Sequence, residues 1–162
     1  MLRKKTITPE AARLRMADLC ARAEHCRSEI EEKLRKMQLS PQAISDITDY
    51  LEENRYIDNC RFARAFARDK VKFSGWGRNK IRMALAMKRI DSHTIADALL
   101  EIDETEYLSS LTTAARGKAR NLDLRDRNDY AKLFRHLASR GFEASLISGV
   151  ISKLKTEEAD SE

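Results

Sequence analysis

The feature that most constrains the fold of this 162-residue chain is a threefold repeat of apolar positions. Six positions between residues 30 and 51 recur roughly 51 and then 52 residues later, with the spacing of two helices joined by a turn. The three sets are Ile30, Leu34, Leu39, Ile44, Ile47 and Leu51; Ile81, Leu85, Ile90, Ile95, Ala98 and Ile102; and Leu133, Leu137, Phe142, Ile147, Val150 and Leu154. Such a unit cannot bury its apolar face alone, so the repeat predicts units stacked in an elongated tandem array.

The composition predicts helices alone. The chain has only 5 Gly and 2 Pro, and few runs of the β-branched and aromatic residues that favour strands. Apolar periodicity and capping residues predict about nine helices and no sheet, so we expect an all-α fold of three three-helix units. The predicted helix starts are Thr8, Ser28, Ser40, Asp58, the residue after Gly77, Asp91, Asp103, Asp126 and Glu143.

We expect these units to form one continuous, solenoid-like domain. The first unit covers residues 1–57 with an N-terminal extension, the second covers residues 58–103, and the third covers residues 104–162. The polar segment 118–127 is predicted to be a loop, and the acidic tail from Thr156 is predicted to fray.

One position in each unit, immediately before the third helix, is predicted to be strained. These positions hold Gln38, Arg89 and Gly141. A helix that stops and reverses usually has glycine there in the left-handed conformation. If Gln38 and Arg89 adopt that conformation, each costs roughly 1 kcal/mol.

The positive charge of the chain is concentrated in its middle. Residues 58–90 contain ten Lys or Arg and two Asp, a net charge of +8 against +5 for the whole chain. Residues 1–57 carry +1 and residues 91–162 carry −4. Such a concentration indicates that the second unit binds a polyanion or an acidic protein surface.

A helix over residues 59–72 is predicted to separate these cations from an apolar face. At about 100° per residue, four of them fall within roughly 80° of one another. They are Arg61, Arg64, Arg68 and Lys72. The opposite side carries Phe62, Ala63, Phe66 and Ala67. We interpret the stripe as a binding surface; the alternative is a solvated face that acids elsewhere in the fold neutralise.

Trp76 lies between two glycines directly after this stripe. An aromatic side chain flanked by cations can stack on a base or dock into a partner; alternatively, it is buried where two units meet. Arg78, Arg82 and Arg89 share one side of the next helix. The full set of candidate partner-binding or nucleic-acid-binding residues is Arg61, Arg64, Arg68, Lys72, Trp76, Arg78, Lys80, Arg82 and Arg89.

The chain lacks the local patterns of the common enzyme classes. It has no phosphate-binding glycine loop, no dinucleotide fingerprint, no H-E-x-x-H and no G-x-S-x-G. Cys20 and Cys26 do not have a zinc spacing and are predicted to be core or edge residues; Met83 and Met87 are predicted to be core residues. We therefore expect a protein that is not an enzyme, with no catalytic residues, no cofactor and no metal.

The sequence also predicts where the protein is found. No apolar run approaches the roughly 18 residues that span a membrane, and the N-terminal residues lack the apolar core of a signal peptide. Three cysteines are an odd number, which is typical of a chain without a disulfide framework. We expect a cytoplasmic protein with no membrane partner.

Residues 56–90 read YIDNCRFARAFARDKVKFSGWGRNKIRMALAMKRI. This stretch resembles the central signature of the RecX family of regulatory proteins, in which an acidic cap precedes R-F-A-x-x-F, basic residues, a G-x-G turn and K/R-I-x-x-x-L-x-x-K-G-I. The matching residues are Asp58, Arg61, Phe62, Ala63, Phe66, Gly75, Gly77, Lys80, Ile81, Leu85, Lys88 and Ile90. Residues 22–34 resemble the first-unit motif of that family. The chain departs from the family pattern at Asn59, where a second acid is common, and at Cys26, where serine is usual. It departs also at Gln38 and Arg89, where glycine is usual.

The resemblance spans about residues 8–155 and implies a three-unit helical array. It implies a protein that binds the filament of RecA recombinase on DNA and mostly inhibits it, by capping filament ends, by blocking the groove, or by both. We expect that protein to be a monomer. Roles in recombination, DNA repair and the SOS response follow, and single-stranded DNA could be contacted as well. The alternative is a direct DNA-binding protein of helix-turn-helix type, because each unit ends in two helices joined by a short turn.

Overall fold

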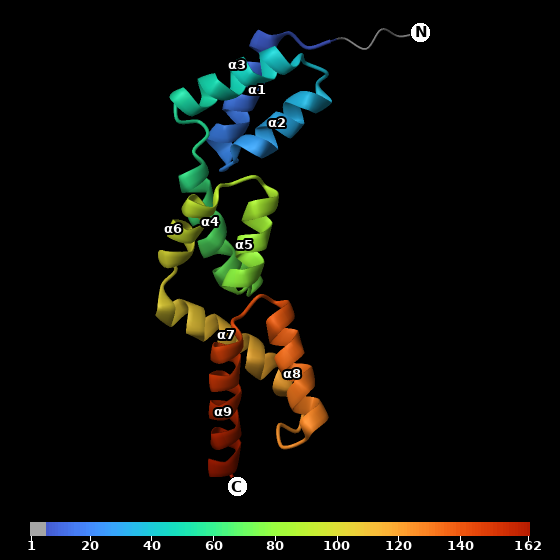
Figure 1. Ribbon diagram of the computed structural model, residues 1–162, viewed down its shortest axis with the longest axis vertical. Helices are drawn as coiled ribbons and strands as arrows, with labels where there is room; N and C mark the ends of the chain where they lie inside the picture. Colours follow the sequence, from blue (N-terminus) through green and yellow to red (C-terminus); the bar gives the residue numbers. More distant parts are fainter. Residues whose placement is uncertain (1–5) are drawn as a thin grey trace, which may run out of the picture.

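The computed structural model describes residues 6–162, which form nine α-helices and one short π-helix (Figure 1). The α-helices are α1 (Pro9–Arg22), α2 (Arg27–Lys36), α3 (Pro41–Glu53), α4 (Asn59–Asp69), α5 (Arg78–Met87), α6 (Ser92–Leu100), α7 (Glu104–Ala119), α8 (Arg127–Ser139) and α9 (Ala144–Asp160). The π-helix η1 (Lys70–Ser74) follows α4, and residues 6–162 contain no strand. Residues 1–5, part of the expected N-terminal extension, lie outside the described residues.

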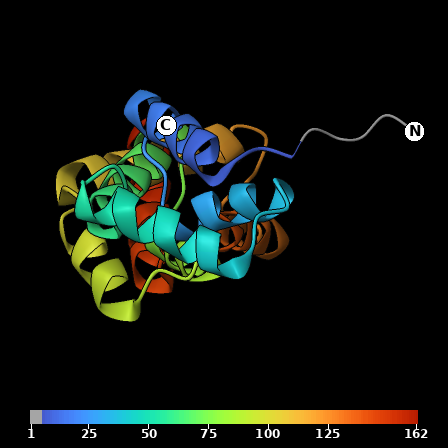
Figure 2. The same ribbon diagram turned by 90° about the horizontal axis from the view of Figure 1, so that it is seen from above.

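The helices stack in three groups along one long axis. Helices α1–α3 lie at one end, α4–α6 in the middle and α7–α9 at the other end (Figure 1). Seen along that axis, the groups overlap and the molecule is much narrower (Figure 2). The predicted all-α, elongated tandem array of three-helix units is confirmed.

Capping side chains begin most helices where the sequence predicts. The Asp58 carboxylate, for example, accepts a hydrogen bond from the Arg61 backbone N–H at 3.0 Å. The predicted start at Ser28 is wrong, because α2 begins at Arg27 and its cap residue is Cys26. The Glu29 carboxylate accepts a hydrogen bond from the Cys26 N–H at 3.4 Å, so the reciprocal part of the cap lies two residues earlier than expected.

The acidic tail is helical to Asp160, so the prediction that it frays from Thr156 is wrong. Two ion pairs hold it to preceding elements: Arg116 with Glu157 and Arg125 with Glu162, each at 3.1 Å. Because these arginines lie some forty positions earlier, only the folded chain brings them to the tail. The predicted loop is also shorter than expected, since α7 continues to Ala119.

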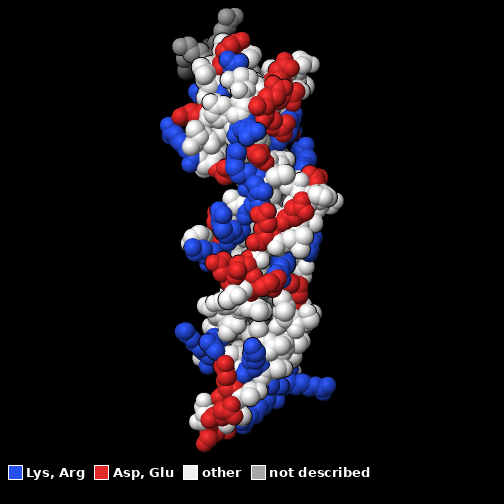
Figure 3. All heavy atoms as spheres, turned by 90° about the vertical axis from the view of Figure 1, so that its left-hand side faces the viewer, with Lys and Arg blue, Asp and Glu red and all other residues white. Residues whose placement is uncertain are grey.

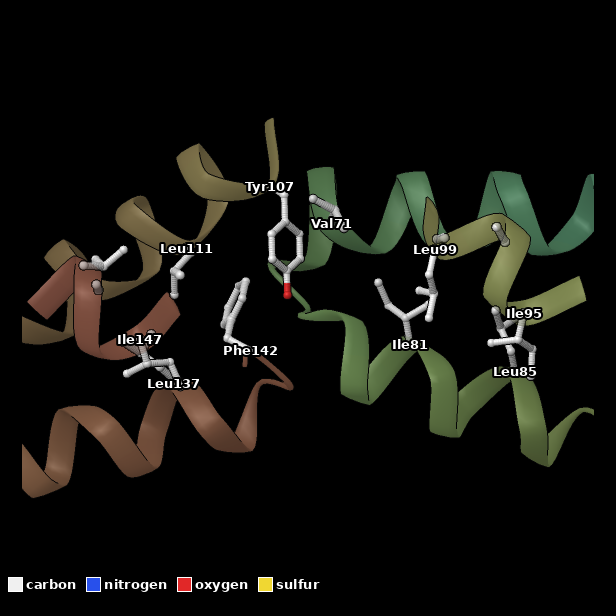
Figure 4. Close-up of a cluster of buried hydrophobic side chains, with 14 of the residues drawn as sticks. Val71, Ile81, Leu85, Ile95, Leu99, Tyr107, Leu111, Leu137, Phe142 and Ile147 are labelled. Atoms are coloured by element: carbon white, nitrogen blue, oxygen red, sulfur yellow. The ribbon is translucent and has the colours of Figure 1, made fainter. Parts of the chain in front are cut away.

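The buried apolar side chains form two clusters. The smaller belongs to the first unit and consists of Ala12, Met16, Ile30, Leu34, Ile47, Leu51 and Ile57. The larger runs without a break through the second and third units (Figure 4). Tyr107 and Phe142 lie where these two units meet, with ring centroids 5.5 Å apart.

Polar contacts dominate the junction between the first and second units. The Arg27 backbone N–H donates to the side-chain oxygen of Asn59 at 3.0 Å, and the Lys88 ammonium lies 3.9 Å from the Glu29 carboxylate. Cys26 is the exception, because its buried thiol joins the cluster of the second unit.

The three turns before α3, α6 and α9 adopt the predicted left-handed conformation. Gln38, Arg89 and Gly141 have φ values of 60°, 56° and 96°. Two non-glycine residues therefore carry backbone strain at equivalent positions of the repeat. Arg55, with φ of 59°, is a further strained residue that the repeat did not predict.

Candidate partner-binding surface of the second unit

Helix α4 separates apolar and cationic sides as predicted. Phe62, Ala63 and Ala67 are buried, whereas Arg64 and Arg68 are exposed. The apolar side packs on α6 and α5, which leaves the opposite side for solvent or for a partner.

The α-helix ends at Asp69, so the prediction that it continues to Lys72 is wrong. After Asp69 the chain widens into η1, which ends at Gly75 in the left-handed conformation with φ of 61°. The wide turn keeps Val71 buried, and its carbonyl accepts a hydrogen bond from the Ser110 hydroxyl of α7 at 3.0 Å.

Arg61 is held by the junction between the first two units. Its Nε lies 2.6 Å from Glu24, and its terminal nitrogen donates to the carbonyls of Arg55 and Tyr56 at 3.1 and 3.3 Å. Its charge is therefore paired within the chain, in agreement with the alternative of neutralisation by the fold.

Arg78 is held in the same way at the junction of the second and third units. Only 15% of its side chain is exposed, and it pairs with Glu143 at 2.7 Å and with Glu104. Its guanidinium carbon lies 3.9 Å from the centroid of the Tyr107 ring. Burial alone would lower the pKa of Arg78, but the hydrogen bond to Glu143 and the charges of both carboxylates outweigh it and raise the pKa.

Tyr107 completes this junction. Its hydroxyl donates to Glu143 and accepts from the Arg78 backbone N–H at 3.0 Å. Burial, followed by the hydrogen bond to Glu143, raises the pKa of Tyr107 above its ordinary value. The four side chains Arg78, Glu104, Tyr107 and Glu143 thus form one hydrogen-bonded network between the units.

Trp76 is half-buried and packs against its own unit. Its ring meets Phe66 of α4 edge to face, with centroids 6.2 Å apart. The ammonium groups of Lys70 and Lys80 lie 4.6 and 4.5 Å from the centroid of the indole ring. Lys70 is not among the predicted partner-binding residues, because the local sequence pattern does not indicate the π-turn that places its ammonium group over the indole.

The remaining cations lie on several sides of the unit. Arg64 and Arg68 border a cleft whose acidic members are Glu101, Asp103 and Glu106, and Arg64 lies 3.7 Å from Glu101. The face that Figure 3 presents correspondingly shows interleaved positive and negative side chains. The predicted stripe is therefore not a continuous cationic surface.

Within residues 6–162, no acidic side chain lies within ion-pair distance of Lys72, Arg82 or Arg89. All three are exposed, and none enters an ion pair within the described part of the chain. Arg82 donates to the Asn79 amide oxygen at 2.9 Å, and the Lys72 ammonium lies 5.4 Å from the exposed Phe73 ring. Phe73 was also missed, since it occupies no repeated apolar position.

Met83 and Met87 are not core residues, so that prediction is wrong. Their exposed fractions are 69% and 85%. Helix α5 buries Ile81 and Leu85 instead, and the methionines project on the other side. The i,i+4 spacing is the same on both sides of the helix, which is why the sequence pattern did not distinguish them.

Among residues 6–162, no three His, Cys, Asp or Glu side chains are placed to hold a metal ion. No helix in that range combines the length and apolarity needed to cross a bilayer. The cysteines are free thiols: Cys26 is buried, Cys20 half-buried and Cys60 exposed. Burial raises the pKa of the Cys20 and Cys26 thiols, which disfavours their reactive thiolate forms.

Comparison with known proteins places the chain among its relatives. A family model described as the second three-helix domain of RecX matches residues 58–99, and one described as the third three-helix domain matches residues 104–151. A protein named regulatory protein RecX from Pseudomonas savastanoi pv. phaseolicola is 33% identical over 147 residues, which cover 90% of this chain and 92% of that protein.

Two further comparisons agree. Regulatory protein RecX of Clostridium botulinum is 29% identical over 77% of this chain, which spans 59% of the length of that relative. A crystal structure of RecX from Lactobacillus salivarius shares the fold, with a TM-score of 0.79 at 24% identity over 91% of this chain and 97% of that one. The sequence signature, the three stacked units and these matches together establish that the chain belongs to the RecX family of regulatory proteins.

Proposed function

We propose that this protein is a non-enzymatic regulator that binds the filament of RecA recombinase on DNA and mostly inhibits its recombinase and ATPase activities. The observation that carries the proposal is the combination of an elongated three-unit array with exposed cations on its middle unit, of which Lys72, Arg82 and Arg89 form no ion pair within residues 6–162. Membership of a family of regulatory proteins supports it. We propose that it acts as a monomer in the cytoplasm, in recombination and DNA repair.

The cations best suited to meet the filament are those that the fold leaves accessible. They are Arg64, Arg68, Lys72, Lys80, Arg82 and Arg89. Accessible Lys and Arg side chains attract phosphates over distances set by the ionic strength and release counterions on binding. Arg61 and Arg78 contribute by fixing the relative positions of the units, because their charges are already paired.

Sequence-specific reading of duplex DNA is less well supported. Helix α6, which would occupy the place of a recognition helix, has no Lys or Arg and exposes Asp97 and Leu100. Helix α3 has no Lys or Arg either. Without Lys or Arg to contact phosphates and guanine edges, neither helix resembles a major-groove recognition helix.

Measuring ATP hydrolysis and strand exchange by RecA on single-stranded DNA, with and without this protein, tests the proposal. We expect inhibition that weakens as salt is raised, because phosphate contacts are screened. Inhibition at a few molecules per filament indicates capping of filament ends, whereas inhibition near saturation indicates groove binding. Unchanged RecA activity together with tight, sequence-dependent binding to duplex DNA would contradict the proposal.

A further inference from the structure

The exposed side of α5 and the adjoining α6 carry an apolar surface that the fold does not use. Met83 and Met87 are 69% and 85% exposed, and Leu100 at the end of α6 is 83% exposed. Single exposed apolar residues are ordinary, but a gathering of them on a small, highly charged protein marks an interaction site.

A groove between the two helices continues this surface. It has a volume of about 600 Å³, and its apolar walls include Ala86, Ile90, Ala96, Leu99 and Leu100. On α5, Ala86 lies about 40° from the groove-lining Arg82, and Met83 and Met87 lie about 60° and 100° further round the helix. The methionines and the groove therefore adjoin across Ala86.

The charged side chains that line this groove are Arg78 and Arg82, of which Arg78 is paired with Glu104 and Glu143. Asp97, the acid of α6, is exposed but does not line the groove. Between Arg78 and Ile90 the sequence contains no Asp or Glu. Arg82 lines the groove and Arg89 is exposed just beyond the end of α5, and no ion pair among the described residues involves either of them. A partner that fits must bring carboxylates to the rim and apolar side chains to the floor.

An amphipathic helix satisfies both requirements. It presents apolar side chains at i, i+3 or i+4 and i+7 along one stripe, and its flanks can carry Asp or Glu opposite Arg82 and Arg89. Flexible, polarisable methionines adapt to such a stripe. A phosphate backbone has no apolar groups to pack against Met83, Met87 and Leu100, so a nucleic acid fits this surface less well.

We infer that the α5–α6 surface, defined by Met83, Met87, Leu100 and the groove beside Arg82, docks an acidic amphipathic helix of a partner protein. This goes beyond the proposed function, because it assigns an apolar protein-binding surface, which shares only Arg82 and Arg89 with the cations proposed to meet the filament. It stands whether or not the partner is a recombinase.

Titration of the full chain with designed helical peptides of about 18 residues, about five turns, tests the inference. One peptide has leucines at i, i+3, i+4 and i+7 flanked by glutamates; a second has lysines in place of the glutamates; a third has the acidic composition with its apolar stripe scrambled. We expect saturable binding of the first peptide only, with NMR chemical-shift changes confined to α5 and α6.

Two variants give the control. The double variant Met83→Ser, Met87→Ser should bind the acidic peptide with an affinity lower by roughly tenfold or more. The double variant Leu14→Ser, Leu108→Ser changes exposed apolar residues elsewhere and should alter that affinity by less than about twofold. Circular dichroism verifies that both stay folded. Equal affinity for the acidic and basic peptides, no saturable binding, or an equal loss in both variants would overturn the inference. So would a methionine variant that loses single-stranded oligonucleotide binding as strongly as peptide binding.

Discussion

A Cβ atom built on Gly77 would overlap the carbonyl carbon of Gly141, so the backbones of the second and third units touch where these two glycines meet. The Gly77 N–H donates to the Arg140 carbonyl at 2.7 Å, and the Asn79 N–H donates to the Gly141 carbonyl at 3.0 Å. The start of α5 is thereby bonded to the turn between α8 and α9. This contact and the shared apolar cluster make the second and third units one packed body.

Replacing Gly77 with Ala should destabilise the protein, because the added methyl group collides with backbone that cannot move aside. We expect a loss of about 1–3 kcal/mol in the free energy of unfolding, measured by urea denaturation. Gly149→Ala is the matched control, since among the described residues nothing beyond its chain neighbours and the local backbone of α9 lies within 4 Å of its Cβ position. That variant should gain about 0.5–1 kcal/mol through higher helix propensity. Equal stability of the two variants would show that the glycine contact is not tight.

Arg78 and Arg82 are one helical turn apart on α5 but should behave differently when replaced by Ala. Arg78→Ala leaves Glu143 without its cation at the junction, so we expect a loss of about 2 kcal/mol or more in unfolding free energy. The Arg82 side chain is exposed and, within residues 6–162, hydrogen-bonded only to Asn79, so Arg82→Ala should change the unfolding free energy by less than about 0.5 kcal/mol. A lower melting temperature for Arg82→Ala than for Arg78→Ala would refute this assignment of roles.

Tyr107→Phe should change how the free energy of unfolding depends on pH under alkaline conditions. Burial and the hydrogen bond to Glu143 raise the pKa of Tyr107, so the folded state keeps its proton where the unfolded chain releases it. The stabilisation is complete below the unfolded pKa of about 10 and declines as pH rises above it. At neutral pH the variant should lose about 1–3 kcal/mol, and its deficit should shrink at higher pH. A deficit that is constant from pH 8 to pH 11 would contradict the assigned network.

Replacing Arg64, Arg68 and Lys72 together with Ser should weaken engagement of the RecA filament without unfolding the protein. The side chains are exposed, so their loss removes long-range attraction rather than packing. Inhibition of RecA ATP hydrolysis should require a higher concentration of the variant, and the salt dependence of binding should become shallower. The control changes Lys33, Lys36 and Lys153 to Ser, which removes the same charge from exposed sites elsewhere. If both triple variants lost inhibition equally, net charge alone would be responsible.

The sequence by itself determined the helices and their repeat, because both depend on residues close together in the chain. Asp58 caps α4 through a residue three positions away, and Ile81 and Leu85 occupy one face of α5 through the period of the helix. The strained turn residues Gln38 and Arg89 could be located in advance for the same reason, since the helix boundaries on either side specify the backbone conformation.

Only the tertiary structure decided which of the similar side chains are engaged. Arg78 finds Glu143 65 residues further along the chain, and Arg61 finds Glu24 37 residues earlier, whereas Arg82 finds no carboxylate among the described residues. Met83 and Met87 have the spacing of core residues, yet packing buries the other face of α5. Local spacing specifies which residues share a face, but pairing and burial depend on which distant element that face meets, and that is settled only when the units stack.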